Sequence, residues 1–126
     1  MNRMLLHIVP AWILVGIVAA PVLAEPPDHW LKKAQTLDKQ GFLDEAAQAW
    51  EKLATTDTNK KRVAYARLKL AGTYFKLDQF RQSIDAARSA IQATPESFDA
   101  HFHLANFLSG TGKFQEAVDT FRKTVA

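Results

Sequence analysis

Residues 104–121 read LANFLSGTGKFQEAVDTF, and this stretch contains one nearly complete copy of the pattern that organises the chain. A leucine–alanine pair is followed by a glycine-rich turn and then by a second run of spaced apolar residues. Apolar residues three and four apart fall on one face of an α-helix, so the stretch predicts two helices joined by a tight turn. Glycine suits such a turn because it takes the left-handed geometry that ends a helix without steric cost.

The same pattern occurs twice more upstream, in the same phase. The step from Ala34 to Ala71 is 37 residues, and the step from Ala71 to Ala105 is 34. The same two steps separate the turn residues, which are Gly41, Asp78 and Gly112. The three extra residues of the first step fit an insertion in the polar segment 57–62, which we predict to be a loop. Internal repetition at this spacing is typical of stacked helical hairpins.

The residue types suggest how the helices pack. The three alanines lie where we expect helices to cross closely, since a larger side chain would push them apart. We expect large residues to fill the neighbouring gaps, namely Trp50, Tyr74, Phe80, Phe114 and Phe121. Asp78 is expected to accept backbone N–H bonds at the start of the following helix. No segment alternates with period two, so no strands are predicted.

Three units in this phase resemble the tetratricopeptide repeat (TPR) family. The residues that carry the resemblance are Trp30, Ala34, Gly41, Leu43-Asp44-Glu45-Ala46 and Trp50; Leu70-Ala71, Tyr74, Phe80, Ala90 and Pro95; and Leu104-Ala105, Gly112, Phe114, Glu116-Ala117 and Phe121. The resemblance implies an all-α fold, a right-handed α-solenoid of three repeats at about 27–60, 64–97 and 98–126. Lys33 stands where the other units carry Leu70 and Leu104, and a polar residue there suits a terminal repeat.

The resemblance also implies a concave groove, lined by the first helix of each unit, that grips a peptide or a helix of a partner. The positions that match this lining are Leu31, Gln35, Asp38, Tyr65, Leu68, Gly72, Phe75, Asp99, Phe102, Asn106 and Ser109. For Leu68 and Phe75, packing against adjacent helices is an equal alternative. One TPR subfamily binds carboxylates through a lysine–asparagine clamp, but Leu31 and Gln35 stand where its first lysine and asparagine would be, so we reject that mode.

The last helix is expected to leave an apolar face, formed by Val118, Phe121 and Val125. In a longer solenoid the next repeat would cover this face. Left bare, it is a patch of the kind that marks an interaction site. Three interpretations stay open: the face self-associates, it docks a partner, or the chain is the front of a longer protein.

The first 24 residues have the three-part pattern of a secretory signal peptide: Arg3, an apolar run from Leu5 to Ala20, and a small-residue exit. Val22 and Ala24 suit a signal peptidase, so we predict cleavage after Ala24 and a TPR domain over 25–126. The predicted location is the periplasm or the outside of the cell. The alternative is an uncleaved segment anchored in the inner membrane.

Composition argues against several functions. Removing residues 1–24 leaves 15 basic and 13 acidic residues, and a net charge of +2 does not favour nucleic acid. The chain has no cysteine, which excludes thiol chemistry. His101 and His103 are two apart on a helix and cannot share a metal. The basic residues Lys60, Lys61, Arg62, Arg67 and Lys69 are interpreted as a solvated helix face.

No catalytic residues, metal site, cofactor or small-molecule substrate are therefore predicted. The sequence favours a non-enzymatic, exported scaffold that holds a protein or peptide partner in a cell-envelope assembly. The alternative is the amino-terminal docking module of a longer exported or membrane-anchored enzyme or assembly factor whose chemistry lies beyond Ala126. A weaker third interpretation is a homodimer that forms through the face of Phe121.

Overall fold

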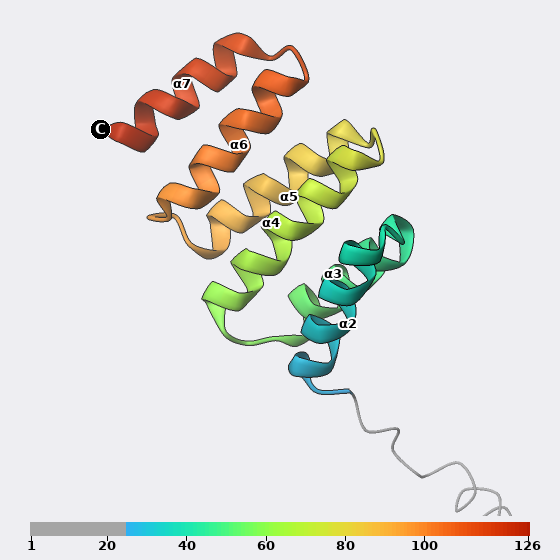
Figure 1. Cartoon of the computed structure of the whole chain (residues 1–126). Helices are drawn as coiled ribbons and strands as arrows, with labels where there is room; N and C mark the ends of the chain where they lie inside the picture. Colours follow the sequence, from blue (N-terminus) through green and yellow to red (C-terminus); the bar gives the residue numbers. More distant parts are fainter. Residues whose placement is uncertain (1–24) are drawn as a thin grey trace, which may run out of the picture.

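A computed structural model describes residues 25–126 of the chain, and the predicted signal peptide, residues 1–24, lies outside the described residues. Within 25–126 the chain forms six α-helices and no strand (Figure 1). The helices are α2 (Pro27–Gln40), α3 (Leu43–Thr56), α4 (Lys60–Lys76), α5 (Phe80–Ala93), α6 (Phe98–Gly110) and α7 (Phe114–Val125). The predicted all-α fold of three helix–turn–helix units is confirmed.

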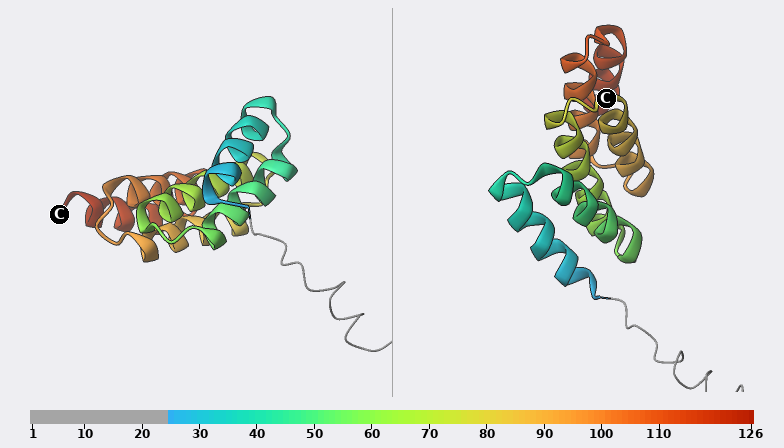
Figure 2. Two further views of the ribbon diagram at one scale, coloured as in Figure 1. Left: turned by 90° about the horizontal axis from the view of Figure 1, so that it is seen from below. Right: turned by 90° about the vertical axis from the view of Figure 1, so that its right-hand side faces the viewer.

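The six helices form antiparallel pairs that stack in a row, with each helix packed against its neighbours in the chain. The first helices of the second and third pairs, α4 and α6, also touch directly. Figure 2 shows that the pairs are rotated relative to one another, so the row twists along its length. Each pair buries its apolar side against the next, as a repeat protein must when no single hairpin has a core of its own.

The small residues lie at the helix crossings, as predicted. Ala34, Ala71 and Ala105 are completely buried. Ser83 occupies the position that holds alanine in the other two units, and it too is completely buried. Its hydroxyl is satisfied because it donates a hydrogen bond of 2.7 Å to the carbonyl of Ala71, which links α5 to α4.

The three turns share one geometry, and here the expectation for Asp78 was wrong. Asp78 does not cap α5; it takes a left-handed backbone with φ of 59°, close to the 83° of Gly41 and the 80° of Gly112. In each turn the next residue donates its N–H to the carbonyl five positions back, as Gln79 does to Tyr74 at 2.9 Å. Aspartate fills the role of glycine because its short polar side chain tolerates this geometry.

The junction between the first two pairs also differs from the prediction. Only residues 57–59 lie outside a helix, and the rest of the predicted loop forms the first turn of α4, which has 17 residues where α6 has 13. Asn59 caps α4 by accepting a hydrogen bond from the N–H of Arg62. The side chain of Arg62 contacts the buried carboxylate of Asp57 at 2.6 Å and also Asp28 of α2 at 3.3 Å. The extra turn therefore ties α4 to α2.

Two of the five large residues do not fill the core as expected. Trp50 is only 1% exposed, and Tyr74 packs against the core. Phe80 and Phe114, however, are 39% and 65% exposed. Both stand at the first position of a helix, directly after a turn, where fewer neighbours surround a side chain.

Candidate binding surface on the inner face

The inner face is the side of the stack that α2, α4 and α6 form together. Tyr65 of α4 stands near its centre and leaves 41% of its surface exposed. The ring of Tyr65 packs edge-to-face on the indole of Trp50, with 5.8 Å between the ring centroids. Two hollows open on either side of Tyr65, and this side chain lines both of them.

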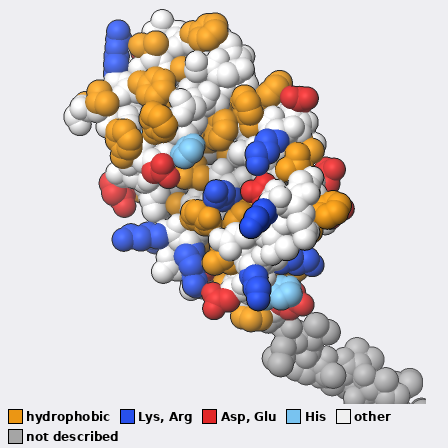
Figure 3. All heavy atoms as spheres, viewed as in Figure 1, with side chains coloured by type: hydrophobic (Ala, Val, Ile, Leu, Met, Phe, Trp, Pro, Cys, Tyr) orange, Lys and Arg blue, Asp and Glu red, His pale blue; other side chains and the backbone are white. Residues whose placement is uncertain are grey.

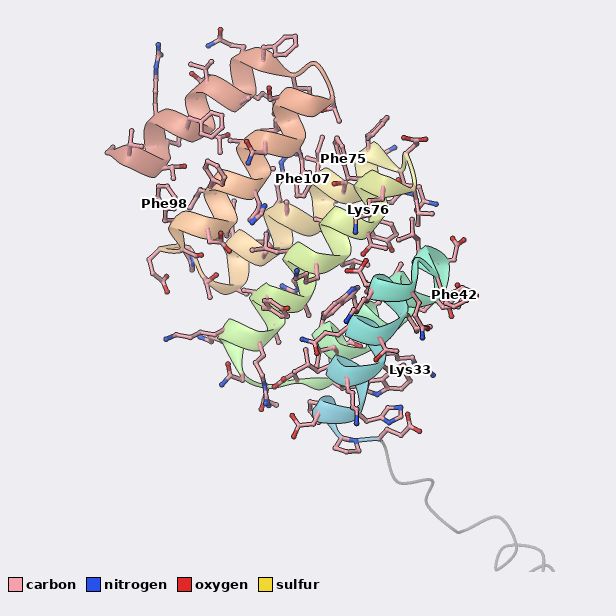
Figure 4. The ribbon with its side chains drawn as sticks, viewed as in Figure 1. Lys33, Phe42, Phe75, Lys76, Phe98 and Phe107 are labelled. Atoms are coloured by element: carbon pink, nitrogen blue, oxygen red, sulfur yellow. The ribbon has the colours of Figure 1, made fainter. Side chains whose placement is uncertain are left out.

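The first hollow lies between α2 and α4, and we call it the basic hollow. Its lining residues are Gln35, Asp38, Lys39, Trp50, Tyr65, Lys69 and Lys76. The ammonium of Lys76 reaches from α4 to the carboxylate of Asp38 on α2, at 3.3 Å (Figure 4). The ammonium of Lys69 stands over the ring of Tyr65, 5.6 Å from its centroid. The structure thus brings together Gln35, Asp38 and Tyr65 of the predicted groove.

The second hollow lies between α4 and the segment that leads into α6. It is lined by Lys61, Ala64, Tyr65, Leu68, Thr94, Glu96, Ser97 and Asp99. Three predicted groove residues, Tyr65, Leu68 and Asp99, meet here. Leu68 is half-buried and still borders the hollow. The surface therefore combines an aromatic and an aliphatic side chain with charged neighbours, which suits recognition of a peptide rather than catalysis.

Known proteins resemble this chain in sequence and in fold. Residues 68–126 match the family model described as "Tetratricopeptide repeat". This match covers less than half of the chain, and the three helix pairs of the described range are TPR-like. No curated protein sequence matches it.

Several solved structures of MamA resemble the TPR-like fold of this chain. One crystal structure of MamA superimposes with a TM-score of 0.68 and 25% identity, over 79% of this chain and 56% of that chain. A second structure, of MamA AMB-1, superimposes with a TM-score of 0.64 and 26% identity, over 91% of this chain and 61% of that chain. The structure of a MamA mutant superimposes with a TM-score of 0.68 and 19% identity, over 90% of this chain and 88% of that chain. At this identity the likeness shows the fold alone. The chain spans little more than half the length of the first of these structures.

The remaining predicted groove residues of the TPR fold lie apart from the two hollows. The ring of Phe75 on α4 packs at a tilt against Phe107 of α6, with 5.4 Å between the centroids (Figure 4), and edge-to-face against Phe80 of α5, with 5.2 Å between the centroids. Leu31 is half-buried and packs against the core. Asn106 is exposed and borders neither hollow.

Phe102 also borders neither hollow. Its ring lies between those of Phe98 and Phe121, 5.9 Å from each centroid, so it joins α6 to α7. Phe98 is 59% exposed and Phe102 40%. Phe102 is thus shared between the inner face and the end of the stack.

The end face of the stack is formed by α7 with the adjoining side of α6. Val118 is 42% exposed and Val125 77%, whereas Phe121 is half-buried against Phe102. Hydrophobic side chains gather over these two helices in the upper left of Figure 3. The opposite end of the stack differs, because the ammonium of Lys33 stands 5.1 Å over the ring of Trp30 on α2.

Sequence reasoning missed the lysines of the basic hollow. The charge pattern predicts a solvated helix face for Lys69 and indicates no role for Lys39 or Lys76. The available signal was their register with the predicted groove: Tyr65, Lys69 and Lys76 are spaced four and seven apart, which places them on one side of α4. Trp50 was expected only as a core residue, yet its edge borders the hollow.

Two histidines on α6 contact nearby oxygen atoms. His101 Nε2 lies 2.8 Å from the carbonyl oxygen of Pro95, and His103 lies 3.4 Å from Asp99. Within residues 25–126 there is no group of three or more His, Cys, Asp or Glu residues that could hold a metal ion. No helix of the described range is both long and apolar enough to cross a bilayer.

Proposed function

We propose that this TPR protein is an exported, non-enzymatic scaffold that holds a peptide or a helix of a partner protein on its inner face, as part of a cell-envelope assembly. The observation that carries the proposal is the placement of Tyr65, an exposed aromatic ring on a rigid helix between two hollows. Tyrosine is enriched at binding hot spots because it offers a large apolar surface and a polar tip at low entropic cost.

The rest of the inner face supports the same function. Leu68 adds an aliphatic contact in the second hollow, and Gln35 adds an amide in the basic hollow. Helices hold all these side chains, so little conformational entropy is lost when a partner binds. The likeness to MamA supports a TPR scaffold. The exported location rests on the sequence pattern of residues 1–24.

The test compares partner capture by the wild type and by a double variant, Tyr65→Ala with Phe102→Ala. Both proteins are used as bait on the native envelope fraction, and the captured proteins are identified by mass spectrometry. We expect the double variant to lose the partner while its helix content, measured by circular dichroism, is unchanged. Phe42→Ala is the matched control, since Phe42 is 54% exposed but lies in the turn between α2 and α3. Equal capture by all three proteins would refute the proposal.

A second candidate function, self-association, is favoured by the difference between the two ends of the stack. The end at α7 exposes Val118 and Val125, whereas the end at α2 carries the charged Lys33. Head-to-tail stacking would press Lys33 onto an apolar face. A second copy therefore fits better through α7 against α7, which gives a closed two-fold dimer.

Sizing with light scattering tests this candidate over a range of protein concentrations. Val125→Lys places a charge within the expected contact and should convert a dimer into a monomer. Phe42→Lys adds the same charge elsewhere and should leave the dimer intact. A wild type that stays monomeric at every concentration would exclude self-association through α7.

A further inference from the structure

The basic hollow carries more positive charge than its own residues neutralise. Lys39, Lys69 and Lys76 border it, and Asp38 is the single carboxylate among its lining residues. Asp38 is already engaged by Lys76. The ammonium of Lys69 faces only the ring of Tyr65 in the contacts of the described residues, and Lys39 is exposed. Figure 3 shows basic side chains around an acidic one where α2 faces α4.

Three arginines of the described chain are arranged differently. Arg62 is paired with Asp57 and Asp28, and Arg88 with Glu116. The guanidinium of Arg67 donates to the carbonyl of Ser89. Unlike these arginines, the three lysines of the basic hollow share a single carboxylate, that of Asp38.

A second observation in the same hollow points to a ligand that accepts hydrogen bonds. Within residues 25–126, two buried side-chain polar atoms have no hydrogen-bond partner, the indole nitrogen of Trp50 and Oδ2 of Asp57. The second of these is compensated, because the guanidinium of Arg62 lies 2.6 Å away. The indole N–H of Trp50 has no such compensation. Leaving a buried donor unsatisfied costs about 1–3 kcal/mol, so an acceptor that reaches it recovers free energy.

The indole that carries this N–H lies beside Tyr65 at the hollow. The phenol ring of Tyr65 stands edge-to-face against the indole, and the side chain of Tyr65 is partly exposed. Both residues line the same volume of about 240 Å³, which is large enough for the end of an aspartate or glutamate side chain or for a terminal carboxylate.

We infer that the basic hollow binds a carboxylate of an acidic peptide segment of the partner, with Lys39 and Lys69 supplying the charge and the indole N–H of Trp50 supplying a neutral donor. The inference rests on the proposed function, because it names the chemistry that the inner face selects. A carboxylate fits both observations: it neutralises the surplus charge and accepts from an N–H. The donors lie on α2, α3 and α4 and bind one carboxylate. The second hollow is then left for a neighbouring side chain of the peptide.

The experiment screens the full chain against an array of random-sequence peptides, each made with a free and with an amidated C-terminus. We expect the bound peptides to be enriched in Asp, Glu or free C-termini. The enrichment should be lost in the variant Lys39→Glu with Lys69→Glu, which leaves the pair of Lys76 and Asp38 intact. It should persist in the control Lys52→Glu with Lys123→Glu, whose charges lie on α3 and α7 outside the hollow.

Binding of the strongest acidic peptide is then measured by fluorescence anisotropy. The double charge reversal should weaken it about tenfold, the sum of two partly exposed charge contacts, and the control should leave it within about twofold. Exchanging glutamate for glutamine, or amidating the terminus, distinguishes a side-chain carboxylate from a terminal one. Bound peptides with no excess of carboxylates would overturn the inference and leave the proposed function standing. An array with no bound peptide would count against the proposed function itself.

Trp50 is too deeply buried to be replaced safely, so its part is tested by nuclear magnetic resonance of the wild type. The indole N–H signal of Trp50, distinguished from those of Trp12 and Trp30 with the variants Trp12→Phe and Trp30→Phe, should move downfield when the acidic peptide is added. It should stay in place with the glutamine counterpart. A signal that does not move during saturating binding would remove Trp50 from the donors.

Discussion

Replacing Asp57 by asparagine tests how the first repeat is held to the second. The side chain of Asp57 is 2% exposed, and its Oδ2 lies 2.6 Å from Nε of Arg62. Its Oδ1 accepts the N–H of Asn59 at 2.8 Å. Asparagine keeps the shape and one acceptor oxygen for Asn59, but it removes the negative charge that holds Arg62 at the junction.

The expected loss follows from the two partners of this contact. Hydrogen bonds to charged groups contribute about 1.5–3 kcal/mol. Arg62 is 46% exposed, so solvent screens part of the interaction. We therefore expect Asp57→Asn to lower the free energy of unfolding by about 1–2 kcal/mol, or the melting temperature by about 5–10 °C for a domain of this size.

The loss should depend on pH in a defined direction. Burial raises the pKa of Asp57, but the N–H of Asn59 and the guanidinium of Arg62 outweigh burial and hold the pKa below its ordinary value. A carboxyl group with a depressed pKa stabilises the fold above its unfolded pKa, and the stabilisation is lost as the pH falls through the folded pKa. The difference between wild type and variant is thus complete at neutral pH and disappears in acid.

Urea unfolding of the full chain, followed by circular dichroism, measures the loss of unfolding free energy and its dependence on pH. Asp85→Asn serves as a control, because Asp85 is exposed on α5 and its loss should change the stability by less than about 0.5 kcal/mol. Combining Asp57→Asn with Arg62→Gln should add little beyond the exposed contact between Arg62 and Asp28, since both changes break the contact between Arg62 and Asp57. Equal stability of wild type and Asp57→Asn at neutral pH, or an equal difference in acid, would show that the reasoning is wrong.

Three further predictions address the turns, the core and the N-terminus. Gly112→Ala should cost about 1–2 kcal/mol in urea unfolding, because its φ of 80° strains any side chain although a Cβ there would meet no neighbour; an unchanged midpoint would contradict this. Ser83→Ala should cost about 1 kcal/mol in thermal unfolding by removing the bond to the carbonyl of Ala71, and a gain in stability would show that alanine packs better there. Protein recovered from the periplasm of an expression host should have the intact mass of a chain that begins at Glu25, whereas Ala24→Arg should retain the longer chain; an uncleaved wild type would favour the anchored alternative.

The repeat phase was enough to predict the framework of this fold. Ala34, Ala71 and Ala105 mark the same crossing three times, and a residue type that recurs at one step along the chain reports on one packing environment. Asp78 was misread because a short polar residue after a helix can either cap the next helix or adopt the left-handed turn. Only its equivalence to Gly41 and Gly112 favoured the second role, and the side chain suggested the first.

The inner face was harder to predict, because periodicity assigns a side chain to a face but not to a neighbour. Tyr65 and Asp99, which the pattern assigns to the groove, both line one hollow. Phe102 obeys the same pattern, yet its ring turns toward Phe121, since no following repeat competes for that space in the described range. The lysines of the basic hollow were not predicted because long charged side chains reach across to other helices. The groups that they contact depend on where the next helix lies.

Tyr65 divides the inner face into two compartments, and a single wall between them makes the compartments thermodynamically linked. Any rotation that enlarges one reshapes the other, so the occupant of the first alters the affinity for the occupant of the second, and the effect is reciprocal. A partner that fills both at once would consequently bind with a free energy that differs from the sum of its two halves.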